Sequence, residues 1–322
     1  MKQYIIRRIL ISIFVLFGVS FLLYAIIRMM PGDFISQVTS GNPQITEEMK
    51  ENLRALYGLD KGIIEGYFSW AKDAIRGDLG TSFVYKQPVT QVIGDRMWVS
   101  FALAGTAFVL QLLIAIPLGV LAATKQYSKT DYTIVAVALA GISLPSFFFA
   151  AVLKRIFAVE LGWFPLQGMV TARADLEGMA LFLDMAWHFV LPVTVFVVTS
   201  IGGLLRYTRT NMLEVLNADY VRTARAKGVS EGKVIGRHAF RNTLIPIVTM
   251  VGGSLPSLFA GAIITEGIFS IDGLGQTALN AIHNGDIPFL MGYNMFIAIL
   301  TLLGTLIADI LYAVVDPRVR YN

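Results

Sequence analysis

The chain contains six long apolar runs separated by polar segments. The runs lie near residues 9–28, 98–123, 132–153, 187–205, 244–265 and 289–314. A helix needs roughly 20 apolar residues to cross a bilayer core of about 30 Å, which is close to the length of each run. The pattern therefore predicts an all-α, polytopic membrane protein with six transmembrane helices, and a single transmembrane domain over residues 1–322.

The first run follows the basic residues Lys2, Arg7 and Arg8, as the apolar region of a secretory signal also does. It continues from Ile9 to Ile27, and no small-x-small cleavage site follows it. We therefore expect an uncleaved first transmembrane helix.

The basic residues between the runs predict the orientation of the chain. With a cytoplasmic N-terminus, the inside segments hold 15 Lys and Arg residues and the short outside segments hold three. Cytoplasmic loops are enriched in Lys and Arg, so this orientation is favoured and both termini are expected in the cytoplasm. Trp98, Trp163 and Trp187 then fall at the outer ends of their spans, where an indole ring prefers the headgroup region.

Two polar segments are too long to be simple connections. Residues 29–96 are expected to form a large extracytoplasmic loop that folds as a cap over the outer mouth. Residues 206–243 are expected to form a cytoplasmic loop. That loop contains four residues at helical spacing: Leu213, Leu216, Tyr220 and Ala224. Gly228 is expected to end this helix in the left-handed conformation, and Ser230 is expected to cap the N-terminus of a second helix. A helix, a tight turn and a second helix have the shape of a docking element.

Composition argues against several classes of function. Of 322 residues, 55% are hydrophobic and only 15% are charged, and the formal net charge is +4. The basic residues are spread between the apolar runs rather than gathered in one patch, which argues against nucleic-acid binding. The chain has no cysteine, and its three histidines lack the spacing of metal ligands, so no metal site is expected.

Neither glycine-rich motif carries nucleotide chemistry. Gly228-Val229-Ser230-Glu231-Gly232-Lys233-Val234 has three rather than four residues between its glycines. Val234 also stands where a P-loop needs Ser or Thr for magnesium, so the chain is not expected to hydrolyse ATP. Gly273-Leu274-Gly275-Gln276-Thr277-Ala278 fits G-x-G-x-x-A but lacks the strand and distal acid of a dinucleotide fold.

Two acidic residues lie in or beside the apolar runs. A proton or cation relay through Asp309 would need companion acids in other runs, and none is evident. We therefore expect Asp309 to lie near the cytoplasmic end and to be satisfied by a neighbouring helix or by water. Glu266 follows the fifth run and is expected at the outer mouth.

The fifth run also contains a stripe of small residues. Gly253, Ser257 and Gly261 recur at every fourth position, which brings them onto one face of a helix. Such a stripe permits close packing of helices, and it also suits the wall of a path for a polar substrate. Both interpretations stay open.

The cytoplasmic loop carries the residues of a family resemblance. Its first run is Asn217-Ala218-Asp219-Tyr220-Val221-Arg222-Thr223-Ala224-Arg225-Ala226-Lys227-Gly228, and its second is His238-Ala239-Phe240-Arg241-Asn242-Thr243-Leu244-Ile245-Pro246. On these residues the chain resembles the B-type permease subunits of the oligopeptide, dipeptide and nickel ABC importers. The loop is similar to that family's form of the cytoplasmic EAA loop, with Arg222-Thr223-Ala224 in place of Glu-Ala-Ala.

Further matches to that family run along the chain: Pro31-Gly32-Asp33, Gly77-Asp78-Leu79-Gly80-Thr81-Ser82, Leu144-Pro145-Ser146-Phe147-Phe148, Gly162-Trp163-Phe164-Pro165 and Asp316-Pro317-Arg318. The segment Asn284-Gly285-Asp286-Ile287-Pro288 keeps only part of the family's outer-loop pattern. The resemblance implies the six-helix fold of a type I ABC importer permease. It also implies that the chain forms half of a translocation path.

The resemblance assigns the coupling to the ATPase to nine residues of the loop: Asp219, Tyr220, Arg222, Thr223, Ala224, Arg225, Ala226, Lys227 and Gly228. It implies a C-type permease as heterodimer partner, two cytoplasmic ATPase subunits that bind ATP and magnesium, and an extracytoplasmic substrate-binding protein. This chain itself would hold no cofactor and bind no nucleic acid. It would lie among the lipids of a bacterial or archaeal cytoplasmic membrane.

Two other functions compete with an importer subunit. A proton-coupled secondary transporter should show buried ionisable relays and often inverted repeats, and a membrane-embedded enzyme should show convergent nucleophiles, acids or a metal. Neither pattern is evident in the sequence. The cargo stays open between dipeptides, longer peptides, nickel and other solutes.

Overall fold

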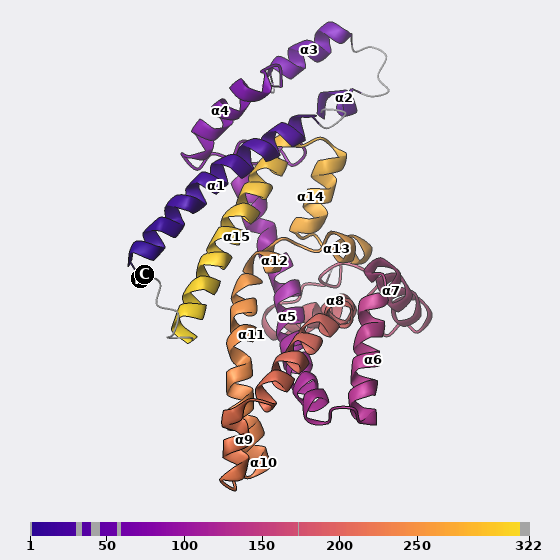
Figure 1. Ribbon diagram of the computed structural model, residues 1–322. Coiled ribbons are helices and arrows are strands. Elements are labelled where there is room, and N and C mark those ends of the chain that lie inside the picture. Colours follow the sequence, from indigo (N-terminus) through magenta and orange to yellow (C-terminus); the bar gives the residue numbers. More distant parts are fainter. Residues whose placement is uncertain (1, 30–33, 40–45, 57–58, 173, 316–322) are drawn as a thin grey trace.

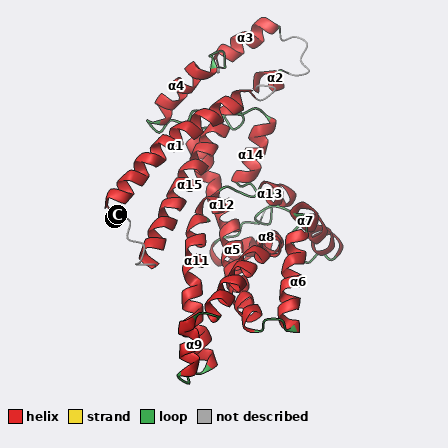
Figure 2. Cartoon of the chain, viewed as in Figure 1, coloured by secondary structure: helices red, strands yellow, loops and turns green. Residues whose placement is uncertain are grey.

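The computed structural model describes residues 2–29, 34–39, 46–56, 59–172 and 174–315. These residues form helices joined by loops, with one isolated bridge between Thr81 and Pro88 (Figure 2). The motifs Pro31-Gly32-Asp33 and Asp316-Pro317-Arg318 lie outside the described residues.

Six segments of the described chain account for the six predicted spans (Figure 1). Four are helices long and apolar enough to cross a membrane: α1 (Lys2–Met29), α5 (Val89–Thr124), α8 (Gly178–Leu216) and α15 (Ile287–Val315). The other two are bent. One joins α6 (Lys129–Ser143) to α7 (Ser146–Leu153) and the π-helix η1 (Lys154–Glu160), and the other joins α11 (Arg241–Gly253) to α12 (Leu255–Phe259) and α13 (Ile263–Phe269).

Two of the six segments are bent, and both bends lie beside prolines. The third segment turns by 96° between α6 and α7, and the fifth by 42° near the start of α12. Leu144 has φ −78° and ψ 125°, because the ring of the following Pro145 disfavours the helical conformation at the preceding residue. Pro256 stands in the first turn of α12, where its missing N–H costs least.

Two helices extend beyond their apolar runs. α5 begins at Val89, inside the predicted outer loop 29–96, and α8 continues to Leu216, inside the predicted cytoplasmic loop 206–243. Hydropathy marks the lipid-facing part of a helix, whereas the backbone hydrogen bonds of the same helix continue into its polar ends.

The outer segment packs on the membrane helices. It contains α2 (Phe34–Val38), α3 (Glu47–Leu56) and α4 (Ile63–Ala74), and α4 lies along α1 (Figure 1). The Tyr67 hydroxyl lies 2.8 Å from Ser20 Oγ, and Arg28 donates to the carbonyl oxygens of Leu59 and Lys61 at 2.9 Å each. α4 and the residues just before it are therefore attached to α1.

Glycines allow α6 and α8 to approach closely. A Cβ on Gly202 of α8 would lie 2.5 Å from the carbonyl oxygen of Ala138, and a Cβ on Gly141 would meet the carbonyl oxygen of Val198. In contrast, a Cβ on the adjacent Gly203 would meet nothing within 4 Å. Close backbone contact of this kind is a common way for helices to associate in lipid.

We expect Gly202→Ala to destabilise the protein by about 1–3 kcal/mol, because the added methyl group overlaps the α6 backbone. The matched variant Gly203→Ala should stabilise the protein by about 0.5–1 kcal/mol through helix propensity alone. Thermal unfolding of both variants in detergent measures the difference. Equal unfolding temperatures for the two variants would contradict the packing of α6 on α8.

Candidate coupling element and outer-side joints

The predicted coupling residues lie at one end of the molecule, opposite α3 and α14 (Leu274–His283) (Figure 1). Seven of them belong to α9 (Asp219–Ala226), and Lys227 and Gly228 directly follow it. The next elements are α10 (Glu231–Lys233) and the π-helix η2 (Val234–Phe240).

The helix predicted through Leu213 and Ala224 is broken. Asn217 ends α8, and Ala218 is extended with φ −71° and ψ 147°. The Asn217 side chain donates to the carbonyl oxygen of Leu213 at 2.9 Å, so it satisfies one of the last carbonyls of α8.

The predicted stop at Gly228 is confirmed. Gly228 has φ +75°, a conformation that glycine adopts without steric cost. Its N–H donates to the carbonyl oxygen of Arg225 at 2.9 Å, and the N–H of Val229 donates to that of Ala224 at 3.2 Å. This pair of bonds is the Schellman motif, so α9 ends in a defined turn.

A small apolar cluster holds this turn against the end of α8. Val221, Ala224 and Val234 are buried, and Val215 and Val229 pack against them. Because the cluster joins α8, α9 and η2, these elements form one unit.

The remaining coupling residues face outward. The exposed set is Asp219, Tyr220, Arg222, Thr223, Arg225, Ala226, Lys227 and Gly228. Arg225 forms two hydrogen bonds to Glu231, of 2.8 and 3.1 Å, which raise the pKa of Arg225 and lower the pKa of Glu231. Arg225 therefore braces the turn.

Tyr220 connects α9 to α11. Asn242 Nδ2 donates to the Tyr220 hydroxyl at 3.2 Å and to the carbonyl oxygen of His238 at 2.9 Å. A displacement of α9 would consequently act on both α8 and α11.

The stripe of small residues divides into two environments. Gly253 and Ser257 are exposed, and a Cβ on Gly253 would meet nothing within 4 Å. Gly261 instead has φ +78°, and a Cβ there would lie 2.8 Å from the Cα of Gly275. Gly253 lies before the bend at the start of α12, Ser257 lies within α12, and Gly261 lies in the break between α12 and α13. Of the three, only Gly261 packs closely within this chain.

Glu266, which was expected at the outer mouth, is fully buried beneath α14. Its carboxylate accepts hydrogen bonds from the Ser100 hydroxyl at 2.8 Å and from the N–H groups of Ala262 at 3.0 Å and Gln276 at 2.9 Å. Gln276 lies in the first turn of α14, where a helix favours negative charge. Glu266 thus joins α5, α13 and the start of α14.

The segment Gly273-Leu274-Gly275 makes room for this carboxylate. A Cβ on Gly273 would lie 2.7 Å from Glu266 Oε2, and one on Gly275 would lie 2.9 Å from the same oxygen. The sequence signal for this site was the G-x-G spacing of Gly273 and Gly275, which follows Glu266 in the chain. It marks a buried carboxylate site within the protein.

Asp286 forms a second joint that the sequence did not indicate. It is fully buried and accepts hydrogen bonds from the Ser82 hydroxyl at 2.5 Å and from the N–H groups of Phe83 at 3.0 Å and Val84 at 3.1 Å. The carboxylate also accepts from the N–H of Phe289, in the first turn of α15. It therefore connects the Gly77–Ser82 motif with the Asn284–Pro288 segment.

Two ion pairs join helices elsewhere in the chain. Arg8 of α1 forms an ion pair with Asp309 of α15 at 2.5 Å, so a neighbouring helix supplies a charge partner for Asp309, as one of the two expected alternatives had it. Arg209 of α8 forms two bonds of 2.7 Å to the buried carboxylate of Asp131 in α6, a pair that the sequence analysis missed. Among the described residues, no group of three or more His, Asp or Glu side chains is arranged to hold a metal ion.

The chain matches two family descriptions that together cover most of its length. Residues 115–321 match "Binding-protein-dependent transport system inner membrane component", and residues 1–104 match "Binding-prot-dependent transport system membrane comp, N-term".

Similar proteins align with the chain over their full length. The oligopeptide transport system permease protein AppB of Bacillus subtilis is 39% identical, and the alignment covers 100% of both chains. The dipeptide transport system permease protein DppB of Escherichia coli is 36% identical, also with 100% of both chains covered. Among solved structures, the inward-facing MetNI methionine ABC transporter matches with a TM-score of 0.55 at 16% identity, over 70% of this chain and 97% of that one.

We expect Glu266→Ala to destabilise the protein by at least about 3 kcal/mol, because the substitution leaves several buried donors without an acceptor. Glu51→Ala, which removes an exposed carboxylate of α3, should change stability by less than about 0.5 kcal/mol. Thermal unfolding in detergent, together with limited proteolysis near residues 261–276, reports both effects. An unchanged unfolding temperature for Glu266→Ala would show that the joint is not required.

Proposed function

The chain belongs to the family of binding-protein-dependent transport system inner membrane components, and on that basis we propose that it carries peptides as half of an ATP-driven import path. It is a multi-pass permease subunit with the fold of the ABC importer membrane component, and ATP hydrolysis belongs to partner subunits. The observation that carries the peptide assignment is full-length similarity at 39% and 36% identity to an oligopeptide and a dipeptide permease.

The family implies ATPase and substrate-binding partners. In the proposed assembly, the second half of the path is a C-type permease, and two ATPase subunits bind ATP and magnesium on the cytoplasmic side. A binding protein delivers the peptide from the outside. The exposed face of α9 supports this arrangement, because its polar residues lie on a unit that protrudes beyond the membrane helices (Figure 1).

Coupling would proceed through rigid contacts. Closure of the ATPase dimer would displace α9, and the valine cluster and the Tyr220–Asn242 bond would pass that displacement to α8 and α11. α11 leads through α12 and α13 to Glu266 and the start of α14 at the outer side. Such rigid-body movement between two packed states is a common form of switching.

The exposed small residues Gly253 and Ser257 are proposed to face the path or the second permease. Short neutral side chains leave space and carry no charge, so a wall of this kind would accept peptides with varied side chains. Gly261 is not part of that surface, because it packs against Gly275.

The proposed orientation can be tested because the chain contains no native cysteine. Thr223→Cys on α9 should react with a membrane-impermeant maleimide only after the cytoplasmic side is made accessible. Glu51→Cys on α3 should react in intact cells, because both positions are exposed but lie at opposite ends of the molecule. Labelling in the reverse pattern would invert the proposed topology.

The coupling role predicts that Gly228→Pro abolishes transport without preventing membrane insertion. Proline cannot adopt φ +75°, so the turn after α9 must change its shape. Peptide uptake by the reconstituted assembly should fall about tenfold or more, while ATP hydrolysis no longer responds to the binding protein. Arg225→Glu should act in the same direction, because it places a second carboxylate against Glu231.

Lys72→Glu, the same charge reversal at an exposed residue of α4, is the control and should retain uptake. Full coupled uptake by Gly228→Pro would refute the coupling assignment. Uptake by the wild-type assembly that continues after ATP is removed would instead favour a secondary transporter.

A further inference from the structure

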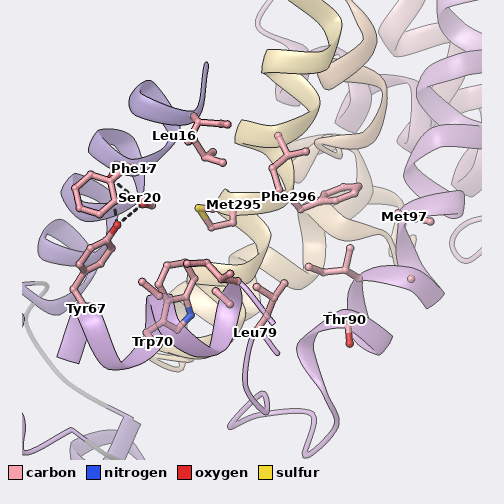
Figure 3. A pocket seen from close by; sticks show the side chains of 17 residues that line it. Leu16, Phe17, Ser20, Tyr67, Trp70, Leu79, Thr90, Met97, Met295 and Phe296 are labelled. Carbon is pink, nitrogen blue, oxygen red and sulfur yellow. Dashed lines mark hydrogen bonds between the residues drawn. The ribbon is translucent and has the colours of Figure 1, made fainter. Parts of the chain in front are cut away.

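A large apolar hollow lies between four helices of the membrane domain. Its volume is about 560 Å³, within the range of binding pockets for small ligands. Figure 3 shows side chains around it from Phe17 and Ser20 of α1, Tyr67 and Trp70 of α4, and Phe296 of α15. The Ser20 and Tyr67 hydroxyls bond to each other, so they leave the interior apolar.

A smaller hollow of about 180 Å³ shares the lining residues Trp70 and Leu79 with the larger one. Arg28 and Lys61 also line it, which brings two cations to one end of the apolar space. Asp73 lies in the same lining and supplies one negative charge. The two hollows together therefore combine a long apolar chamber with a polar compartment that holds both signs of charge.

Trp70 stands between the two compartments and carries an unpaired donor. Its Nε1 is buried and has no hydrogen-bond partner among the described residues. Buried N–H groups are almost always paired, so an acceptor from a ligand would complete this site.

The larger hollow opens on an exposed apolar surface of the membrane-spanning helix α1. Ile13 of α1 and Ile75, which directly follows α4, both line it, and they are 60% and 88% exposed. Beside them on α1, Leu10 and Phe14 are 62% and 79% exposed. A contiguous apolar surface on a membrane-spanning helix is surrounded by acyl chains, so lipid has direct access to the opening.

We propose that this groove binds one phospholipid with an amine-bearing headgroup. An acyl chain occupies the larger hollow, the phosphate lies by Arg28 and Lys61, and the amine faces Asp73. An ester or phosphate oxygen accepts the hydrogen bond of Trp70. The inference needs only that α1 spans a membrane, so it stands or fails separately from the peptide path.

The test is photo-crosslinking of the assembled importer in vesicles that contain phosphatidylethanolamine with a diazirine in its acyl chain. Crosslinked peptides are identified by mass spectrometry, and we expect them within residues 13–20 and 70–75. Gly94 also lines the larger hollow, and a Cβ there would meet nothing within 4 Å, so Gly94→Leu adds a side chain at the wall of the hollow where the first added carbon has room. Crosslinking to both segments should fall about tenfold in this variant.

The matched control is Gly105→Leu, a substitution in the same helix at a position that does not line the hollow. It should crosslink like the wild type, and both variants should unfold at the wild-type temperature or above because leucine favours helix over glycine. Equal crosslinking in Gly94→Leu and Gly105→Leu would overturn the proposal, since it would indicate surrounding lipid only. Crosslinks from these segments to a second protein subunit would also overturn it.

Lys61→Glu tests the headgroup. It should reduce crosslinking severalfold, whereas Lys72→Glu on the exposed side of α4 should not. A photoreactive fatty acid without phosphate should label the site weakly. Equal labelling by the fatty acid and the phospholipid would overturn the headgroup assignment.

Discussion

The structure depends on one constraint, which is that backbone groups inside a bilayer must find hydrogen-bond partners within the protein. Four spans meet it as uninterrupted helices. The other two bend at Pro145 and near Pro256. Proline has no backbone N–H, so one helical hydrogen bond is missing there whether or not the helix bends. Residues 143–145 of the first bend are exposed in this chain, and Ser254 and Pro256 of the second bend are partly buried. α8 packs on α6 just before the first, and a Cβ on Gly304 of α15 would lie 3.0 Å from Pro256 Cδ.

Away from α9, two buried carboxylates hold the ends of helices together. Glu266 and Asp286 each accept backbone N–H groups at the start of a helix, where negative charge is stabilised. Each also binds a segment more than 160 residues away in sequence, through Ser100 or Ser82. The outer half is thereby fixed by charge-assisted bonds, whose removal would leave several buried donors unpaired.

The end of the molecule that carries α9 is built differently. The coupling element is attached through a few valines and the Tyr220–Asn242 bond, while its polar residues face solvent. Such a unit can move as one piece and pull on α8 and α11, because those contacts join it to both helices. The proposed lipid groove lies away from this route, between α1 and α4. A lipid bound there would fill a hollow that otherwise weakens the attachment of α1.

The sequence by itself determined the number and order of the spans, the left-handed stop at Gly228 and the family, because these depend on local composition and spacing. It also indicated that a neighbouring helix satisfies Asp309. Only the tertiary structure decided the 96° bend, the enclosure of Glu266 and the pairing of Arg209 with Asp131. These features depend on which distant segments meet, and hydropathy and periodicity describe one helix at a time.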